Sequence, residues 1–182
     1  MQSQGGFLFL GMALNIEIKA KTDNPQFIRN YLTNMKAEFR GTDLQTDTYF
    51  NVPNGRLKLR EGNIENNLIF YSRPDAPAAK ESSFHLAHIP DAKNLKEILT
   101  KSLGVKIIVR KKREIYFIKN VKFHIDNVDG LGNFAEIEAS DLYADLSREE
   151  LQSQCDFYLR ELKIRDEDLV SVSYSDMLFA QV

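Results

Sequence analysis

The chain has 182 residues, of which 43% are hydrophobic and 27% charged, the profile of a soluble globular protein with one sizeable core. Its 24 Lys and Arg nearly balance its 26 Asp and Glu, which argues against a nucleic-acid partner. The single cysteine, Cys155, excludes an internal disulfide and a four-cysteine zinc site. The three histidines form no zinc motif, so any metal should have oxygen ligands.

The apolar run 7–10 near the N-terminus is too short to span a membrane and follows no basic segment of a secretory signal. We therefore expect residues 1–11 to be a disordered extension, with Met12 as an alternative start, and residues 12–182 to form a single domain. No membrane partner is expected, and a cytoplasmic location follows by default.

Residues 15–21 alternate between polar and apolar side chains, which predicts a half-buried strand. Glu17, Lys19 and Lys21 share one face of this strand. A charged strand face usually meets water, but the same pattern returns further along the chain with charges of different sign. This repetition is the first indication that the charged faces serve a purpose.

The next elements are a helix and two strands. Asn24-Pro25 starts an amphipathic helix over about 24–36, residues 38–50 form a strand, and a turn at 53–55 leads into the strand 56–61. The last strand carries Arg56, Lys58 and Arg60 on one face. Three cations on so short a face repel one another unless an anion lies among them, although a solvated face explains the pattern equally well.

The middle of the chain predicts strands over 68–73, 80–89 and 105–118, the last two separated by a helix that Asp91 caps and Gly104 ends. The apolar stripe of that helix comprises Leu95, Ile98, Leu99 and Leu103. The strand 105–118 contains the basic run 110–113, in which Lys111 and Arg113 share a face.

The last strands, 122–126 and 134–138, carry acidic side chains. Asp126 lies on one face of the first strand, and Glu136 and Glu138 share a face of the second. Carboxylates at i and i+2 point to the same side and can converge on one divalent cation, although this spacing is nearly as common in solvated strands. The final helix begins with a capping box at Ser147, and its apolar stripe makes Cys155 a core residue rather than a nucleophile.

About eight strands with short turns and three helices predict an α+β fold. If the sheet closes into a barrel, its charged faces line a polar lumen; an open sheet would send them to water. Inside a barrel, Glu17, Asp126, Glu136 and Glu138 would supply a cation site. A cationic lining would come from Lys19, Lys21, Arg56, Lys58, Arg60, Lys111 and Arg113. This combination suits a polyphosphate chelated to Mg²⁺ or Mn²⁺.

Five motifs in sequence resemble those of the class IV adenylyl cyclase and thiamine triphosphatase superfamily, also called the CYTH domain or triphosphate tunnel metalloenzymes. They are Asn15-x-Glu17-x-Lys19, Leu57-Lys58-Leu59-Arg60, Lys111-x-Arg113-x-x-Tyr116, Gly130-Leu131-Gly132-x-Phe134-x-Glu136-x-Glu138 and Ser173-Tyr174-Ser175-Asp176-Met177-Leu178. The resemblance covers roughly residues 13–179.

The resemblance implies an eight-stranded antiparallel closed β-barrel, or tunnel, with flanking helices, which holds a triphosphate with one or two Mg²⁺ or Mn²⁺ ions. Glu17, Glu136 and Glu138 match metal ligands, and Glu17, Glu136 and the nearby Asp126 are the candidate catalytic residues. The residues matching triphosphate-binding positions are Lys19, Lys58, Arg60, Lys111 and Arg113; alternation adds Lys21 and Arg56.

The reaction implied first is that of an adenylyl cyclase, which converts ATP to cyclic AMP and pyrophosphate. Hydrolysis of inorganic triphosphate, thiamine triphosphate or a nucleoside triphosphate is the alternative. Two positions depart from the family pattern: Asn15 stands where glutamate is usual, and Ser72 where many members have lysine. These departures keep a third interpretation open, a non-catalytic module that binds polyphosphate or nucleotide. A homodimer also stays open.

Overall fold

The computed structural model describes residues 14–72, 83–141 and 145–181. Eight antiparallel strands form one sheet in the order β1-β8-β7-β6-β2-β3-β4-β5. The strands are β1 (Asn15–Lys21), β2 (Glu38–Phe50), β3 (Arg56–Glu61), β4 (Asn67–Ser72), β5 (Ser83–His88), β6 (Val105–Ile118), β7 (Val121–Val128) and β8 (Gly132–Ser140). Every predicted strand is present within a few residues of its expected bounds. The expected extension, residues 1–11, lies outside the described residues.

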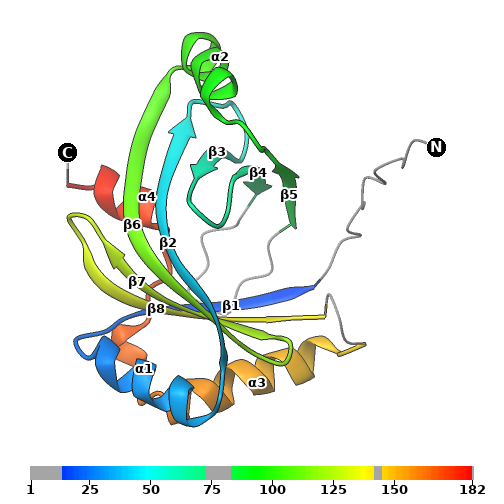
Figure 1. Ribbon diagram of the computed structural model, residues 1–182, viewed down its shortest axis with the longest axis vertical. Helices are drawn as coiled ribbons and strands as arrows, with labels where there is room; N and C mark the ends of the chain where they lie inside the picture. Colours follow the sequence, from blue (N-terminus) through cyan, green and yellow to red (C-terminus); the bar gives the residue numbers. More distant parts are fainter. Residues whose placement is uncertain (1–13, 73–82, 142–144, 182) are drawn as a thin grey trace.

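The sheet is strongly curled. Figure 1 shows β2 and β6 curving through the whole molecule, with β3, β4 and β5 beside their upper halves and β1, β7 and β8 beside their lower halves. These two strands are the longest, at 13 and 14 residues. The predicted eight-stranded antiparallel fold with flanking helices is therefore confirmed.

The predicted closure of the sheet into a barrel differs from what is observed. In the described part of the chain β1 and β5 are the two edges of the sheet, and no strand pairing joins them. The sheet is a half-barrel, and its curvature rather than a closing hydrogen-bond ladder creates an inner face.

The helices are α1 (Pro25–Asn34), α2 (Lys93–Leu103), α3 (Arg148–Glu161) and α4 (Tyr174–Phe179), with a 3-10 turn, η1 (Asp166–Asp168). The Asn24 side chain accepts a hydrogen bond from the Phe27 backbone N–H at 3.0 Å, as expected for the cap of α1. Ser147 and Glu150 form the predicted capping box of α3. The stripe predicted for α2 is wrong at Ile98, which is 61% exposed, because α2 contacts the sheet along a narrower line through its leucines.

Helices α1 and α3 pack on the outer face of β1, β7 and β8 (Figure 1). Ile16, Phe123, Ile137 and Leu151 are buried there together with Cys155. Burial raises the pKa of the Cys155 thiol to about 12, so Cys155 is the core residue that the sequence predicts. Because alternate residues of a strand point to opposite sides, the charged residues of these strands must face the inside of the curl.

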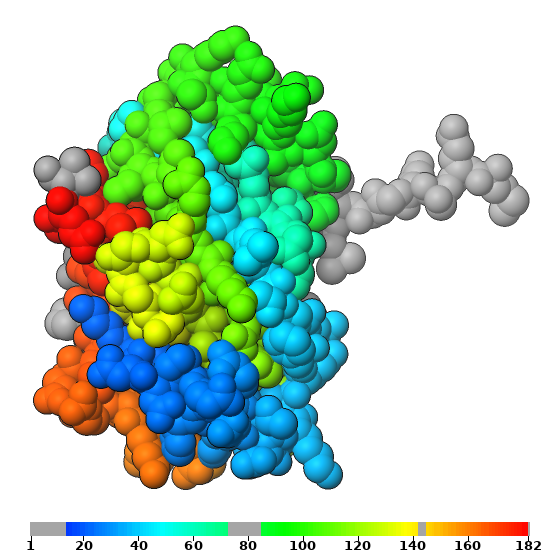
Figure 2. Space-filling view, turned by 60° about the vertical axis from the view of Figure 1, so that its left-hand side comes forward, coloured from blue at the N-terminus to red at the C-terminus, as the bar shows by residue number. Residues whose placement is uncertain are grey.

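Figure 2 shows the β7–β8 hairpin (yellow) between β6 (green) above it and the β1–α1 segment (blue) below it. The α4 segment (red) lies at its side. In the described part of the chain, no helix is both long and apolar enough to cross a membrane.

Candidate active site

The inner face of β1 and β8 brings the predicted acidic residues together. In the β1–β8 register Glu17 lies opposite Glu138, and Lys19 lies opposite Glu136. The Lys19 Nζ is 3.2 Å from Glu136 Oε1 and 3.9 Å from Glu17 Oε1. Lys19 therefore lies between two of the predicted acidic residues, Glu17 and Glu136.

Arg113 on β6 joins this acidic group to β7. Its Nε donates a hydrogen bond to Asp126 Oδ1 at 2.7 Å, and its Nη2 donates to Glu136 Oε2 at 2.6 Å. The Tyr174 hydroxyl donates to Asp126 Oδ2 at 2.9 Å. Burial works against the positive charge of Arg113, but Asp126 and Glu136 outweigh it and hold the Arg113 pKa well above its usual range. Asp126 thus holds the guanidinium in place.

A second group of ion pairs is centred on Asp47 of β2, which is 1% exposed. Asp47 Oδ1 accepts from Arg60 Nε at 2.8 Å, and Oδ2 accepts from Lys58 Nζ at 2.9 Å. Lys111 Nζ is 3.6 Å from the same Oδ2. Burial opposes the ionisation of Asp47, but these three cations outweigh it and hold the Asp47 pKa well below its usual range. Asp47 is the anion that the clustered cations require.

Asp47 is absent from the predicted site, although the sequence carries a signal for it: Asp47 alternates with Tyr49 on the inward face of a predicted strand. Glu65 was also missed. Its carboxylate accepts from Arg60 Nη1 at 2.8 Å and from Lys122 Nζ at 2.9 Å. Glu65 lies between β3 and β4 in irregular structure, where periodicity carries no information. Lys122 shares a strand face with Asp126 and was available from alternation.

Lys111 has the most unusual environment of the basic residues. Burial lowers its pKa, the Arg113 charge lowers it further, and Asp47 only partly offsets them, which leaves the Lys111 pKa at about 7. Lys111 therefore changes its charge near neutral pH, whereas an ordinary lysine does so near 10.4.

The metal-binding prediction can be compared with the chemistry at Glu138. Burial raises the Glu138 pKa, and the charges of Glu17 and Glu136 add to the effect. Asn15 Nδ2 donates to Glu138 Oε1 at 3.0 Å, while Asn15 Oδ1 is buried and has no hydrogen-bond partner among the described residues. The nearby Lys122 charge lowers the Glu138 pKa but only partly offsets the burial. Carboxylate oxygens next to an unpaired amide oxygen are the donor chemistry of a hard cation.

The positions of these side chains fit a metal ion less well than their chemistry does. Across residues 14–72, 83–141 and 145–181, no three His, Cys, Asp or Glu side chains are already grouped as they would be around a metal ion. The Glu136 oxygens contact Lys19, Arg113 and His124 instead. Glu17, Glu136 and Glu138 therefore remain predicted ligands.

The remaining predicted residues lie at the margins. Arg56 Nη2 donates to Asp176 Oδ2 at 2.9 Å. Lys21 is exposed at the end of β1, and no ion pair within the described chain includes it. The paired cations at the centre are Lys19, Lys58, Arg60, Lys111, Arg113 and Lys122, facing Glu17, Asp47, Glu65, Asp126, Glu136 and Glu138. These six cations and six carboxylates make the inner face close to neutral, whereas the sequence predicts a cationic lining.

Comparisons with known proteins identify the family of this chain. Residues 13–174 match the model of the CYTH domain. The "Putative adenylate cyclase MJ0240" of Methanocaldococcus jannaschii is 26% identical over 177 residues, covering 90% of this chain and 98% of that protein. A solved structure from Pyrococcus horikoshii superposes with a TM-score of 0.78 at 24% identity, covering 89% of this chain and 98% of that one.

A more distant solved structure is that of a "putative adenylyl cyclase" from Hippeastrum, described as revealing a dominant triphosphatase activity. Its TM-score is 0.66 at 15% identity, covering 93% of this chain and 96% of that one. It shares the fold of the curled sheet. The family model extends from β1, with Glu17, to Tyr174 at the start of α4, so the match covers both ion-paired groups, and the chain belongs to the CYTH domain family.

Proposed function

We propose that this protein is a divalent-metal-dependent enzyme that acts on a triphosphate compound, most like a class IV adenylyl cyclase that converts ATP to cyclic AMP and pyrophosphate. The observation that carries the proposal is the pairing of buried cations with carboxylates on one inner face. Arg113, Lys111 and Arg60 come from neighbouring parts of the sheet and carry more donors than their carboxylate partners use.

The chain's own residues would bind and orient the triphosphate. The guanidinium forks of Arg60 and Arg113 match the spacing of phosphate oxygens, and the ammonium groups of Lys19 and Lys111 act as point charges. In the cyclase reaction the ribose 3′-oxygen attacks the α-phosphorus, its proton passes to solvent, and the bond to the bridging oxygen breaks so that pyrophosphate leaves. Arg113 and Lys19 would stabilise the charge on the departing pyrophosphate, since such transfers depend mainly on positioning and electrostatic stabilisation.

Glu17, Glu136 and Glu138, with the amide oxygen of Asn15, would hold Mg²⁺ or Mn²⁺. When bound, such an ion neutralises phosphate charge and polarises a phosphoryl oxygen. His124 would orient one ligand: its Nδ1 is 3.0 Å from Glu136 Oε2. Burial, reinforced by the Arg113 charge, lowers the His124 pKa to about 3, so the imidazole is neutral and its Nδ1–H donates to the ionised Glu136.

Triphosphate hydrolysis is the second candidate, supported by the dominant triphosphatase activity described for the Hippeastrum protein. In this reaction a water molecule attacks the γ-phosphorus and loses a proton to solvent, the bond to the bridging oxygen breaks, and orthophosphate and the diphosphate leave. The same cations would bind the substrate, which is inorganic triphosphate, thiamine triphosphate or a nucleoside triphosphate. Binding without turnover is a third outcome, because Asn15 brings no charge to the acidic group.

The test is turnover of ATP, tripolyphosphate and thiamine triphosphate by Glu17→Gln and Glu136→Gln, each with Mg²⁺ or Mn²⁺. We expect both variants to lose metal-dependent turnover while their circular dichroism spectra stay unchanged. Glu149→Gln, an exposed position on α3, is the matched control and should keep full activity. Full activity in both inner-face variants would remove the metal-site assignment.

A further inference from the structure

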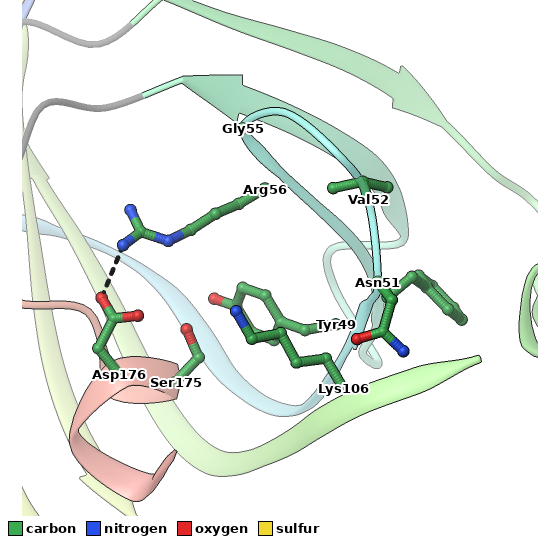
Figure 3. Close-up of a pocket in the computed structure, with 9 residues that line it drawn as sticks. Tyr49, Asn51, Val52, Gly55, Arg56, Lys106, Ser175 and Asp176 are labelled. Atoms are coloured by element: carbon green, nitrogen blue, oxygen red, sulfur yellow. Dashed lines mark hydrogen bonds and ion pairs between the residues drawn. The ribbon is translucent and has the colours of Figure 1, made fainter. Parts of the chain in front are cut away.

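A small cavity adjoins the ion-paired inner face. Its volume is about 100 Å³, and it lies between the β2–β3 hairpin, the start of β6 and α4 (Figure 3). The residues that matter for its chemistry are Tyr49, Asn51, Arg56, Lys106, Ser175 and Asp176. None of the residues given a role in the proposed function lines this cavity.

The cavity lies next to Lys58, one of the cations proposed to bind phosphate. Arg56 and Lys58 share one face of β3, and Tyr49 follows Asp47 on one face of β2. Tyr49 and Lys58 are partners in the β2–β3 register, and Lys58 Nζ is 5.5 Å from the centroid of the Tyr49 ring. Two residues of a strand span roughly 7 Å, so Lys58 lies about that far along β3 from Arg56, which lines the cavity. A group attached to a phosphate held by Lys58 can therefore reach the cavity.

The lining is mixed in charge. Arg56 and Lys106 bring positive charge, and Figure 3 shows the carboxylate of Asp176 bonded to the Arg56 guanidinium, with the hydroxyl of Ser175 beside it. The side-chain hydrogen bonds of Asp176 to Arg56 and to Ser173 all use Oδ2, and a carboxylate has about four acceptor positions. A carboxylate repels a further phosphate but accepts hydrogen bonds from sugar hydroxyls, as acidic residues in dinucleotide sites do.

We propose that this cavity binds the sugar of a nucleoside triphosphate, with its hydroxyls donating to Asp176 and its α-phosphate beside Lys58. The inference rests on the proposed function, since it requires the triphosphate to bind at the inner face. It assigns the substrate class: nucleoside triphosphates gain contacts that inorganic triphosphate cannot make.

The test is a calorimetric titration, in buffer with a metal chelator so that no turnover occurs, of ATP, 2′,3′-dideoxy-ATP and tripolyphosphate. The wild-type protein should bind ATP about tenfold more tightly than dideoxy-ATP, as expected for lost hydrogen bonds to a charged group. Asp176→Asn should weaken ATP binding by a similar factor and leave dideoxy-ATP and tripolyphosphate within about twofold.

Two further variants separate the outcomes. Val52→Phe, which fills the cavity without changing charge, should weaken ATP and leave tripolyphosphate unchanged. Asp129→Asn, at an exposed acid on the β7–β8 turn, should change the affinity for neither ligand.

Equal losses of affinity for ATP and dideoxy-ATP in Asp176→Asn would mean that Asp176 acts through α4 rather than on the sugar, and would overturn the sugar site. If tripolyphosphate binds but the sugar hydroxyls make no difference, the cavity assignment fails and the proposed function stands. If the wild-type protein binds no tripolyphosphate even when Mg²⁺ is added in excess of the chelator, the proposed function itself fails.

Discussion

The buried lysine Lys111 is the residue whose charge is most sensitive to conditions. In the free protein it loses its proton as the pH rises through about 7. A bound triphosphate favours the charged form and restores the proton. Binding therefore takes up a proton above pH 7, and the affinity must fall as the pH rises from 7 to 9.

The Lys111→Arg variant checks this prediction, because arginine keeps its charge throughout this range. The slope of log Kd for tripolyphosphate against pH should be steeper in the wild-type protein by up to about one decade per pH unit, the limit for one proton. The ionisation of tripolyphosphate itself contributes equally to both slopes and cancels. Identical slopes would show that Lys111 does not titrate on binding.

At the residue scale, the sequence predicts the inward side chains well and their partners poorly. Alternation placed Glu17, Lys19 and Arg113 on inward faces, as the structure has them. It could not show that Asp47 would lie among the basic residues, because the pairing depends on which strands become neighbours. Glu65 carried no periodic signal at all.

At the scale of elements, the two capping boxes have different roles. Ser147 caps α3 on the outer face of the sheet, and Ser173 caps α4, which carries Tyr174. The Tyr174 hydroxyl bonds Asp126, and its ring centroid is 4.1 Å from Lys19 Nζ and 5.3 Å from Lys111 Nζ. Helix α4 therefore supports the inner face directly, and α3 does not.

We expect Ser147→Ala and Ser173→Ala each to lower the free energy of unfolding by about 1 kcal/mol, the usual loss for a helix cap. Only Ser173→Ala should also weaken tripolyphosphate binding, by roughly threefold or more, because Tyr174 loses its fixed position against charged partners. Urea unfolding and calorimetry measure the two effects. A loss of affinity in Ser147→Ala, or none in Ser173→Ala, would contradict this division of roles.

The same comparison shows which elements periodicity can find. The predicted strand 105–118 matches β6 at both ends, because fourteen residues carry a strong alternating signal. Helix α4 has six residues, fewer than two turns, so no helical period develops. Its capping box, Ser173 with Asp176, is the local signal in the sequence that could predict the start of this helix.

At the scale of the whole molecule, two features determine the site: the curvature of the sheet and the balance of charges on its inner face. Alternation shows which side chains share a face but not how far a sheet curls, so the half-barrel was not predictable from the sequence. The equal numbers of buried cations and carboxylates on the inner face mean that the free site offers little net positive charge to a triphosphate. A divalent ion that arrives with the substrate would supply the missing charge, which is the physical reason for the proposed metal dependence.

Product analysis with ATP, tripolyphosphate and thiamine triphosphate, each with and without Mg²⁺ or Mn²⁺, tests the central claim most directly. We predict turnover that depends on the metal, with cyclic AMP and pyrophosphate formed from ATP. Orthophosphate released from any of the three would identify the hydrolase reaction at the same site. No product from any of them with either metal, together with no detectable binding of tripolyphosphate, would contradict the assignment of the inner face as a triphosphate site.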